Sequence, residues 1–382
     1  MANTITNVLP KLLAQGLLAL REQAVMPRLV NNSYSDLAAA KGNVINIPIS
    51  YALVATNVTP SSAPASNVDS SPTVALVTLD FWKESTFQLS DNDIVSVMDG
   101  TIPMQASEAV KAVSNAIDQY ILGKHTGFFG AAGTAGTTPF NASLNMAVDA
   151  RKKLNRQLAP MDDRRVVIDP SAEANLLLNT QVLQFDQRGD TGGIIRGQIG
   201  TKLGFDWYMD QNITTYTPGT GWASGNIAST VAGAIGDTTL NIINATASGA
   251  IKVGDIFTLT ADTTYSYQYV VTTAATISAT VAVAISFYPA LKTAVATGAT
   301  LVVVSVPYVV NLAFHRDAFA WASRPLQDIE GLGNALRSAS DPISGVALRL
   351  EVSRQNRQTT FGYDVLGGSN IVRKEFGCKI FG

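Results

Sequence analysis

Cysteine and histidine are almost absent from this sequence. The single cysteine, Cys378, excludes an internal disulfide and any metal site built from several cysteines. It is expected to be a small buried apolar residue. His125 and His315 are the two histidines, and neither has a histidine or cysteine at metal-ligand spacing. The sequence therefore predicts no metal centre and no cofactor.

Charge is also scarce. Charged residues make up 15% of the chain, and 27 Lys and Arg nearly balance 29 Asp and Glu, giving a net charge of −2. A balanced chain has no overall attraction to nucleic acid, which needs a basic excess or patch. Two interpretations of the sparse charge stay open. The surface is either a soluble one rich in Ser, Thr and Asn, or one largely buried against other subunits, where charge is depleted.

Long apolar runs are missing. No run reaches the roughly 18 residues of a membrane span. The nearest candidate, residues 300–314, is interrupted by Pro307, and its valines favour strands. The N-terminal stretch has no basic segment ahead of its apolar part and contains Pro10, so it does not read as a signal peptide. We expect no membrane partner.

Catalytic motifs are missing too. His315-Arg316-Asp317 matches the core of a kinase catalytic loop, but the position that should hold a metal-binding Asn is Ala322, and the companion motifs do not occur. The Gly-rich segment 189–193 lacks the Lys-Ser/Thr ending of a phosphate loop. An enzyme centred on Asp317 and His315 is thus the weak alternative. We interpret the triplet as a polar turn closing a strand, and we predict no catalytic residues.

What the sequence does contain is a series of distinct parts. Helical periodicity with one apolar face occurs at 6–25 and 101–124, and helices are also expected at 143–157 and 171–179. Pro27 is expected to end the first and Ser171 to cap the last. The strongest is 101–124, which would span roughly 30 Å. Strands are expected at 164–170, 204–209 and 347–355, and a further hairpin at 359–380.

Residues 44–51 alternate, with Ile45, Ile47 and Ile49 on one face, and a second extended stretch follows at 73–89. Together they predict a long hairpin. The connection between its strands is rich in Ser, Pro, Ala and Asn, and a connection of this length is usually functional or disordered. A hairpin this long buries too little on a monomer to order itself. We therefore expect it to lie across a neighbouring subunit.

The composition changes between residues 219 and 306. This stretch holds five charged residues: Asp237, Lys252, Asp255, Asp262 and Lys292. Short Val-, Ile- and Thr-rich segments alternate there with Gly-Asp turns, which predicts a small antiparallel β barrel or sandwich. Because it interrupts an α/β passage, it is predicted to be an inserted domain. Earlier in the chain, Arg151, Lys152 and Lys153 form a short basic cluster, interpreted as a solvated helix face or as a contact with nucleic acid on an inner surface.

Four stretches carry a resemblance to a known family: residues 1–32, 197–213, 309–326 and 361–380. With the order of the parts, they make the chain resemble the major capsid (coat) proteins of tailed double-stranded DNA bacteriophages, in the branch with an inserted immunoglobulin-like or β-barrel domain. In that pattern His315-Arg316-Asp317 is structural. The resemblance covers essentially the whole chain, and the inserted domain matches by position and composition.

The resemblance implies an α+β fold, the tailed-phage major capsid fold with an inserted all-β domain. The implied parts are an N-terminal arm (1–43), an extended loop (44–90), a peripheral domain (91–142) with a spine helix at 101–124, an axial domain (143–218 and 307–340), the inserted β domain (219–306) and C-terminal strands of the peripheral and axial domains (341–382).

The implied function is a virion shell subunit that assembles with itself through pentamers and hexamers into an icosahedral head around phage DNA. Implied partners are a scaffolding protein, a portal, packaged DNA contacted non-specifically on the inner face, and a decoration protein. Assembly in the host cytoplasm is expected. No Lys–Asn pair suggests itself for a cross-link, so we expect a non-covalent shell. Asp262, Tyr265 and Tyr267 are the candidate contact loop of the inserted domain. A β-rich surface adhesin is the alternative function.

Overall fold

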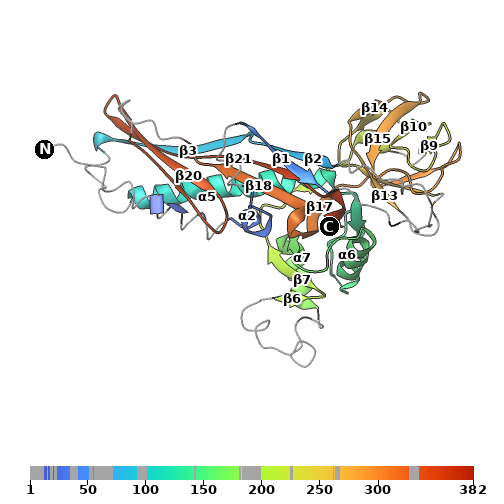
Figure 1. Cartoon of the computed structure of the whole chain (residues 1–382), viewed down its shortest axis with the longest axis horizontal. Coiled ribbons are helices and arrows are strands. Elements are labelled where there is room, and N and C mark those ends of the chain that lie inside the picture. The colour runs from blue at the N-terminus through green and yellow to red at the C-terminus, as the bar shows by residue number, and fades with distance from the viewer. Residues whose placement is uncertain are drawn as a thin grey trace, which may run out of the picture. The chain divides into compact units, whose positions relative to one another are not determined.

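The computed structural model of the chain forms two compact units (Figure 1). It describes residues 13–14, 16–17, 20, 24–34, 42–50, 55, 72–92, 101–141, 143–179, 182, 199–223, 227–260, 262, 267–326 and 335–382. The first unit comprises Met1–Arg21, Asn31–Val113 and Phe319–Val372, and the second comprises Glu22–Val30, Ser114–Ala318 and Arg373–Gly382. None of the helices in these described ranges is long and apolar enough to span a membrane.

A five-stranded antiparallel sheet forms the body of the first unit. Its strands are β3 (Phe81–Ser90), β18 (Phe319–Arg324), β19 (Ala335–Ser340), β20 (Ala347–Gln355) and β21 (Gln358–Ile371). The predicted strand at 347–355 is confirmed as β20, with Leu348, Leu350 and Val352 buried on one face. A two-residue turn, Asn356 and Arg357, joins β20 to β21, and both residues have positive φ. This is the turn geometry that matches the twist of paired strands.

The predicted extended hairpin is also in the first unit. β1 (Val44–Ile49) pairs antiparallel with β2 (Thr73–Thr78), with Val44 opposite Thr78 and Ile49 opposite Thr73. The connection predicted between them lies mostly outside the described residues. The single stretch expected at 73–89 is instead two strands, β2 and β3. The chain changes its pairing partner at Leu79 and Asp80, so that β3 pairs with β21 and not with β1.

The long helix predicted at 101–124 is confirmed as α5 (Thr101–Gly123). Its apolar stripe is buried, with Val110, Val113, Ile117 and Ile121 almost inaccessible. The predicted helix over 6–25 lies mostly outside the described residues. Pro27, expected to end that helix, lies instead in the first turn of a short helix, α2 (Met26–Leu29). Proline is well tolerated there because the N–H groups of a first turn have no intrahelical acceptor.

A seven-stranded mixed sheet forms the centre of the second unit. Its strands are β4 (Gly130–Ala132), β5 (Arg164–Ile168), β6 (Thr201–Lys202), β7 (Phe205–Met209), β8 (Thr215–Tyr216), β17 (Tyr308–His315) and β22 (Gly377–Phe381). The predicted helices at 143–157 and 171–179 are confirmed as α6 (Asn145–Arg156) and α7 (Pro170–Leu178). The side chain that caps α7 is Asp169 and not Ser171: its carboxylate accepts the N–H groups of Ser171 and Ala172.

The prediction of a hairpin at 359–380 is wrong. After β21 the chain turns through a short 3-10 helix, η5 (Lys374–Phe376), and β22 pairs with β17 and β4 rather than with β21. The two segments alternate as strands do, but each finds its partner in a different sheet. Cys378 lies in β22 and is fully buried, as predicted.

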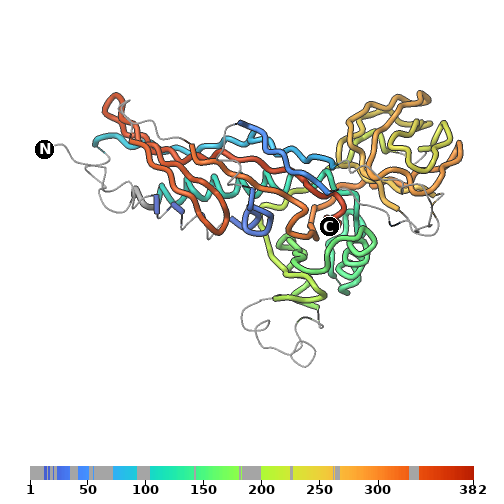
Figure 2. The backbone as a smooth tube through the Cα atoms, in the orientation of Figure 1, coloured from blue at the N-terminus to red at the C-terminus, as the bar shows by residue number. Residues whose placement is uncertain are grey.

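An all-β domain is inserted between β8 and β17. Its strands are β9 (Ile227–Ser229), β10 (Thr239–Asn244), β11 (Gly249–Ile251), β12 (Ile256–Leu259), β13 (Gln268–Val271), β14 (Ala275–Ile277), β15 (Val283–Tyr288) and β16 (Leu301–Val303). Figure 2 traces the segment in yellow to orange. Six strands form one antiparallel sheet in the order β16-β12-β13-β15-β10-β9. A bridge between Ala228 and Thr300 joins its two edges, so the sheet closes into a barrel around an aromatic core that includes Trp222, Phe257 and Phe287.

Candidate assembly surface and buried polar sites

The inner face of the β1–β2 pair is a small hydrophobic core. Ile45 and Ile47 of β1 are buried with Val77 of β2, and they pack against Ala320 and Ala322 of β18. A slip of one residue would move this whole set to the solvent side, so its burial fixes the strand register. The base of the extended hairpin is therefore held by the subunit's own core.

The outer face of the same pair is apolar and exposed. Val44, Val74 and Leu76 are 50%, 53% and 51% exposed. Alternation along the strands places them opposite the buried isoleucines, and Val74 and Leu76 are neighbours on that face. Contiguous exposed apolar residues are typical of interaction surfaces, whereas isolated ones are not. We call Val44, Val74 and Leu76 the hairpin strip.

Hydrogen bonds from side chains to backbone carbonyls, and one close backbone approach, hold the hairpin base to the five-stranded sheet. The Asn370 side chain donates to the carbonyl of Leu76 at 2.8 Å, and Arg324 Nη1 donates to the carbonyl of Gly42 at 3.1 Å. A Cβ on Gly368 would overlap the Thr78 carbonyl, so only glycine permits this close approach. These contacts position the hairpin strip without using its side chains.

A buried carboxylate, Asp118, lies on α5. Its two oxygens accept the backbone N–H groups of Met26 at 3.0 Å and Val25 at 3.2 Å, at the start of α2. Burial and the nearby Asp210 together raise the pKa of Asp118 to about 8, against the lowering effect of the two N–H groups and Arg28. Asp118 thus connects α5 to the N-terminal segment by a contact whose charge depends on pH.

We expect Asp118→Asn to change the pH dependence of stability. The folded-state pKa of about 8 exceeds the ordinary value of 3.8. Between these values the folded protein therefore keeps a proton that the unfolded chain has lost. The Asp118 contribution to the free energy of unfolding is then largest below pH 4 and is lost as the pH rises to 8. In urea unfolding measured from pH 5 to pH 9, the stability of the variant relative to the wild type should rise with pH. The scale of this change in the free energy of unfolding is roughly 1.4 kcal/mol per pKa unit.

Asp162→Asn, at an exposed position on the loop before β5, is the control for this measurement. Its difference from the wild type should stay nearly constant over the same pH range. If the Asp118→Asn difference is equally constant, Asp118 does not titrate in this range and the assignment is wrong.

The junction of the inserted domain is built around Asp255. This carboxylate is almost fully buried. It accepts the Tyr216 hydroxyl at 2.8 Å, the Trp222 indole N–H at 2.6 Å and the Lys252 backbone N–H at 2.7 Å. The Gly219 N–H also donates to it, at 3.2 Å. Since Tyr216 lies in β8 and the others lie in the domain, Asp255 fixes the domain to the sheet.

A buried lysine lies in the same junction. Lys379 of β22 is inaccessible to solvent, and its ammonium donates to the carbonyl of Gly254 at 3.0 Å. Burial lowers the pKa of Lys379 to about 7, against the raising effect of Asp255. Burial and Lys379 also lower the pKa of the neighbouring His125, whose ring packs edge-on against Tyr216. Neither ring nitrogen of His125 has a hydrogen-bond partner among the residues that the structure describes, so this ring serves packing.

His315-Arg316-Asp317 forms the polar turn predicted from the sequence. His315 ends β17, and a 3-10 turn, η4 (Arg316–Ala318), follows. The buried His315 ring accepts the Asp317 backbone N–H through Nδ1 at 3.1 Å and packs against Phe376. Among the residues that the structure describes, no three His, Cys, Asp or Glu side chains group as metal ligands.

The basic cluster on α6 does not form one stripe. Arg151 donates to the carbonyl of Leu203 at 3.0 Å, and Lys152 lies 4.0 Å from Asp149 on the exposed face. Lys153 is half-buried, and burial lowers its pKa. The three cations therefore face different surroundings, which is not the arrangement of a continuous surface for a nucleic-acid backbone.

The candidate contact loop is only partly as expected. Asp262 is 6% exposed, and its carboxylate accepts the N–H of Tyr267 at 2.7 Å. This hydrogen bond ties the carboxylate to the backbone of its own loop, so Asp262 is less accessible than an exposed contact residue. Tyr265 lies outside the described residues. Tyr267 lies in the wall of a cavity.

Comparison with known proteins identifies the fold. No protein-family model and no curated protein matches the chain. A solved chain of Mycobacterium phage Che8 matches with a TM-score of 0.54 and 16% identity, over 94% of this chain and 91% of that one. A chain in the capsid structure of the Cyanophage P-SCSP1u matches with a TM-score of 0.50 and 13% identity, over 94% and 88%. The expected fold class is confirmed: this chain has the α+β fold of tailed-phage capsid subunits, with an inserted all-β domain.

Proposed function

We propose that this protein is a major capsid protein that assembles with itself, through pentamers and hexamers, into the icosahedral head of a tailed bacteriophage. The observation that carries the proposal is the fold, matched along nearly the whole of both chains. A shell subunit needs several modest interfaces that close by symmetry rather than one tight site. The hairpin strip and the sparse charge suit such interfaces.

The parts of the fold then have assigned roles. The proposed boundaries are an N-terminal arm at 1–43, an extended loop at 44–90, a peripheral domain at 91–142, an axial domain at 143–218 and 307–340, an inserted domain at 219–306, and closing strands at 341–382. In this assignment α5 is the spine of the peripheral domain. The β1–β2 pair is the base from which the extended loop reaches a neighbouring subunit.

The proposed partners follow from the role. They are a scaffolding protein and a portal during assembly in the host cytoplasm, a decoration protein on the finished particle, and packaged DNA on the inner face. The balanced charge of the chain suits loose contact with DNA and not tight binding. The protein is proposed to be non-enzymatic and its shell non-covalent.

Electron microscopy of the purified chain tests this function. Under conditions that promote association, such as high protein concentration with a crowding agent, we expect closed shells or separate pentamers and hexamers. Sedimentation velocity on the same samples gives the size of each species. A strictly monomeric chain under all these conditions would contradict the proposal and favour a monomeric surface-binding protein.

A further inference from the structure

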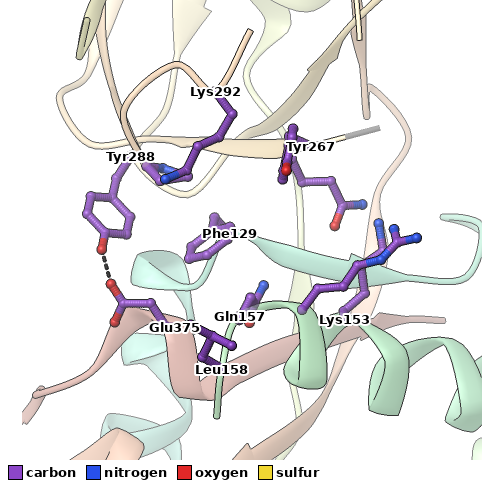
Figure 3. A pocket seen from close by; sticks show the side chains of 11 residues that line it. Phe129, Lys153, Gln157, Leu158, Tyr267, Tyr288, Lys292 and Glu375 are labelled. Carbon is purple, nitrogen blue, oxygen red and sulfur yellow. Dashed lines mark hydrogen bonds between the residues drawn. The ribbon is translucent and has the colours of Figure 1, made fainter. Parts of the chain in front are cut away.

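A cavity of about 240 Å³ lies between the inserted domain and α6 (Figure 3). Figure 3 shows Tyr288, Lys292 and Tyr267 on one side, Lys153 and Leu158 on the other, and Phe129 between them. The cavity is smaller than the roughly 300–1,000 Å³ of sites for drug-sized ligands. It has room for one large side chain, and its aromatic walls suit an apolar one.

The charge around this cavity is mainly positive. Lys153, Arg156 and Lys292 line it, with Glu375 as the one carboxylate among the described lining residues. Glu375 already accepts the Tyr288 hydroxyl, which leaves it less available to neutralise a cation. Lys153 is half-buried, and burial lowers its pKa. An incoming carboxylate would therefore stabilise the charged form of Lys153 and offset the effect of burial.

Leu158, on the rim of the cavity, adds an independent observation. Two backbone hydrogen bonds end α6. The N–H of Leu158 donates to the carbonyl of Asn155, and the N–H of Ala159 donates to the carbonyl of Leu154. In this motif the residue at position 158 takes the left-handed conformation that glycine favours. Here it is a leucine with φ of 59°, and it is 86% exposed. A strained backbone that displays an apolar side chain points to a functional contact.

We propose that this cavity binds an acidic peptide segment of a partner protein. An apolar side chain of the segment enters the cavity, its carboxylates face Lys153, Arg156 and Lys292, and its backbone covers Leu158. A peptide fits better than a small anion, because Leu158 and Arg156 are exposed at the rim and only an occupant larger than the cavity would bury them. It fits better than nucleic acid, because the rim is apolar at Leu158 and acidic at Glu375.

Fluorescence anisotropy with the full-length unassembled chain tests the proposal. The probe is a fluorescein-labelled pentapeptide of sequence Asp-Phe-Asp-Leu-Asp. We expect the double variant Lys153→Gln/Lys292→Gln to weaken binding by about tenfold or more, since each lost contact is charge-assisted. Lys152→Gln is the matched control: it removes a cation from the same helix outside the cavity, and it should leave the affinity unchanged.

Leu158→Gly separates binding from folding. Glycine relieves the strained φ, so the midpoint of thermal unfolding should stay the same or rise. Peptide affinity should nevertheless fall, because the apolar contact at the rim is lost. A purely structural role for Leu158 would leave the affinity unchanged.

Four results would overturn the proposal. They are no binding of the pentapeptide by the wild type, equal binding of Lys-Phe-Lys-Leu-Lys, tighter binding of a five-nucleotide oligothymidylate, and unchanged affinity in the double variant. If the double variant instead weakens self-association of the chain while the peptide does not bind, the occupant is a second copy and not a partner protein.

Discussion

A chain lacking residues 56–72 should fold normally and form no closed shells. The deletion keeps β1, β2 and the core residues Ile45, Ile47 and Val77, which hold the hairpin base to its own subunit. It removes the segment proposed to reach a neighbour. Thermal unfolding should therefore change little, whereas the shells seen by electron microscopy should disappear.

The length of the segment and its sequence can be separated. A matched variant replaces residues 56–72 with a Gly/Ser segment of equal length. Shells from this variant but not from the deletion would mean that only reach matters, whereas no shells from either would mean that the side chains make the contact. Normal shells from the deletion itself would refute the proposed role of the extended loop.

Asp255→Ala should give the largest loss of stability of any single substitution discussed here. It leaves the Trp222 indole and the N–H groups of Gly219 and Lys252 without their acceptor, whereas the Tyr216 hydroxyl keeps the carbonyl of Val253. Each buried donor left unpaired costs about 1–3 kcal/mol. Since such costs are not fully additive, we expect the free energy of unfolding to fall by about 4 kcal/mol or more.

Asp237→Ala is the control for this substitution. Asp237 is in the same domain, but its side chain is exposed and accepts one N–H, that of Ala234. Its loss should cost less than about 1 kcal/mol. Urea unfolding followed by tryptophan fluorescence is a suitable measurement, because Trp222 contacts Asp255 directly. Similar losses for both variants would show that the junction does not depend on the Asp255 carboxylate.

The periodicity of apolar residues was sufficient to predict an element wherever the segment packs against one surface. The α5 stripe through Val110, Val113 and Ile117 repeats every three or four residues, because one face of the helix is buried along its length. Periodicity failed where partner choice mattered. The alternation at 73–89 does not indicate that β3 pairs with β21 and not with β1. The pattern at 359–380 likewise does not indicate that β22 pairs with β17 and not with β21. Both choices are set by contacts distant in sequence.

The buried charges were missed for a different reason. Asp118 follows Ile117 on the apolar face of α5, and a carboxylate in that position was a usable signal. Asp255 follows a glycine and was read as part of an ordinary turn, since sequence does not show how many donors converge on one carboxylate. Lys379 lies in a strand buried on both faces, where the alternation that normally separates inside from outside is lost.

Entry and exit of the inserted domain are direct neighbours, since Tyr216 of β8 is paired with Tyr308 of β17. Paired Cα atoms in antiparallel strands are about 5 Å apart. A different folded cargo whose ends meet at that spacing can therefore join residues 217 and 307, provided that it also supplies an acceptor for the buried Lys379 ammonium in place of the Gly254 carbonyl. In the proposed shell, this position would be a graft point for multivalent display.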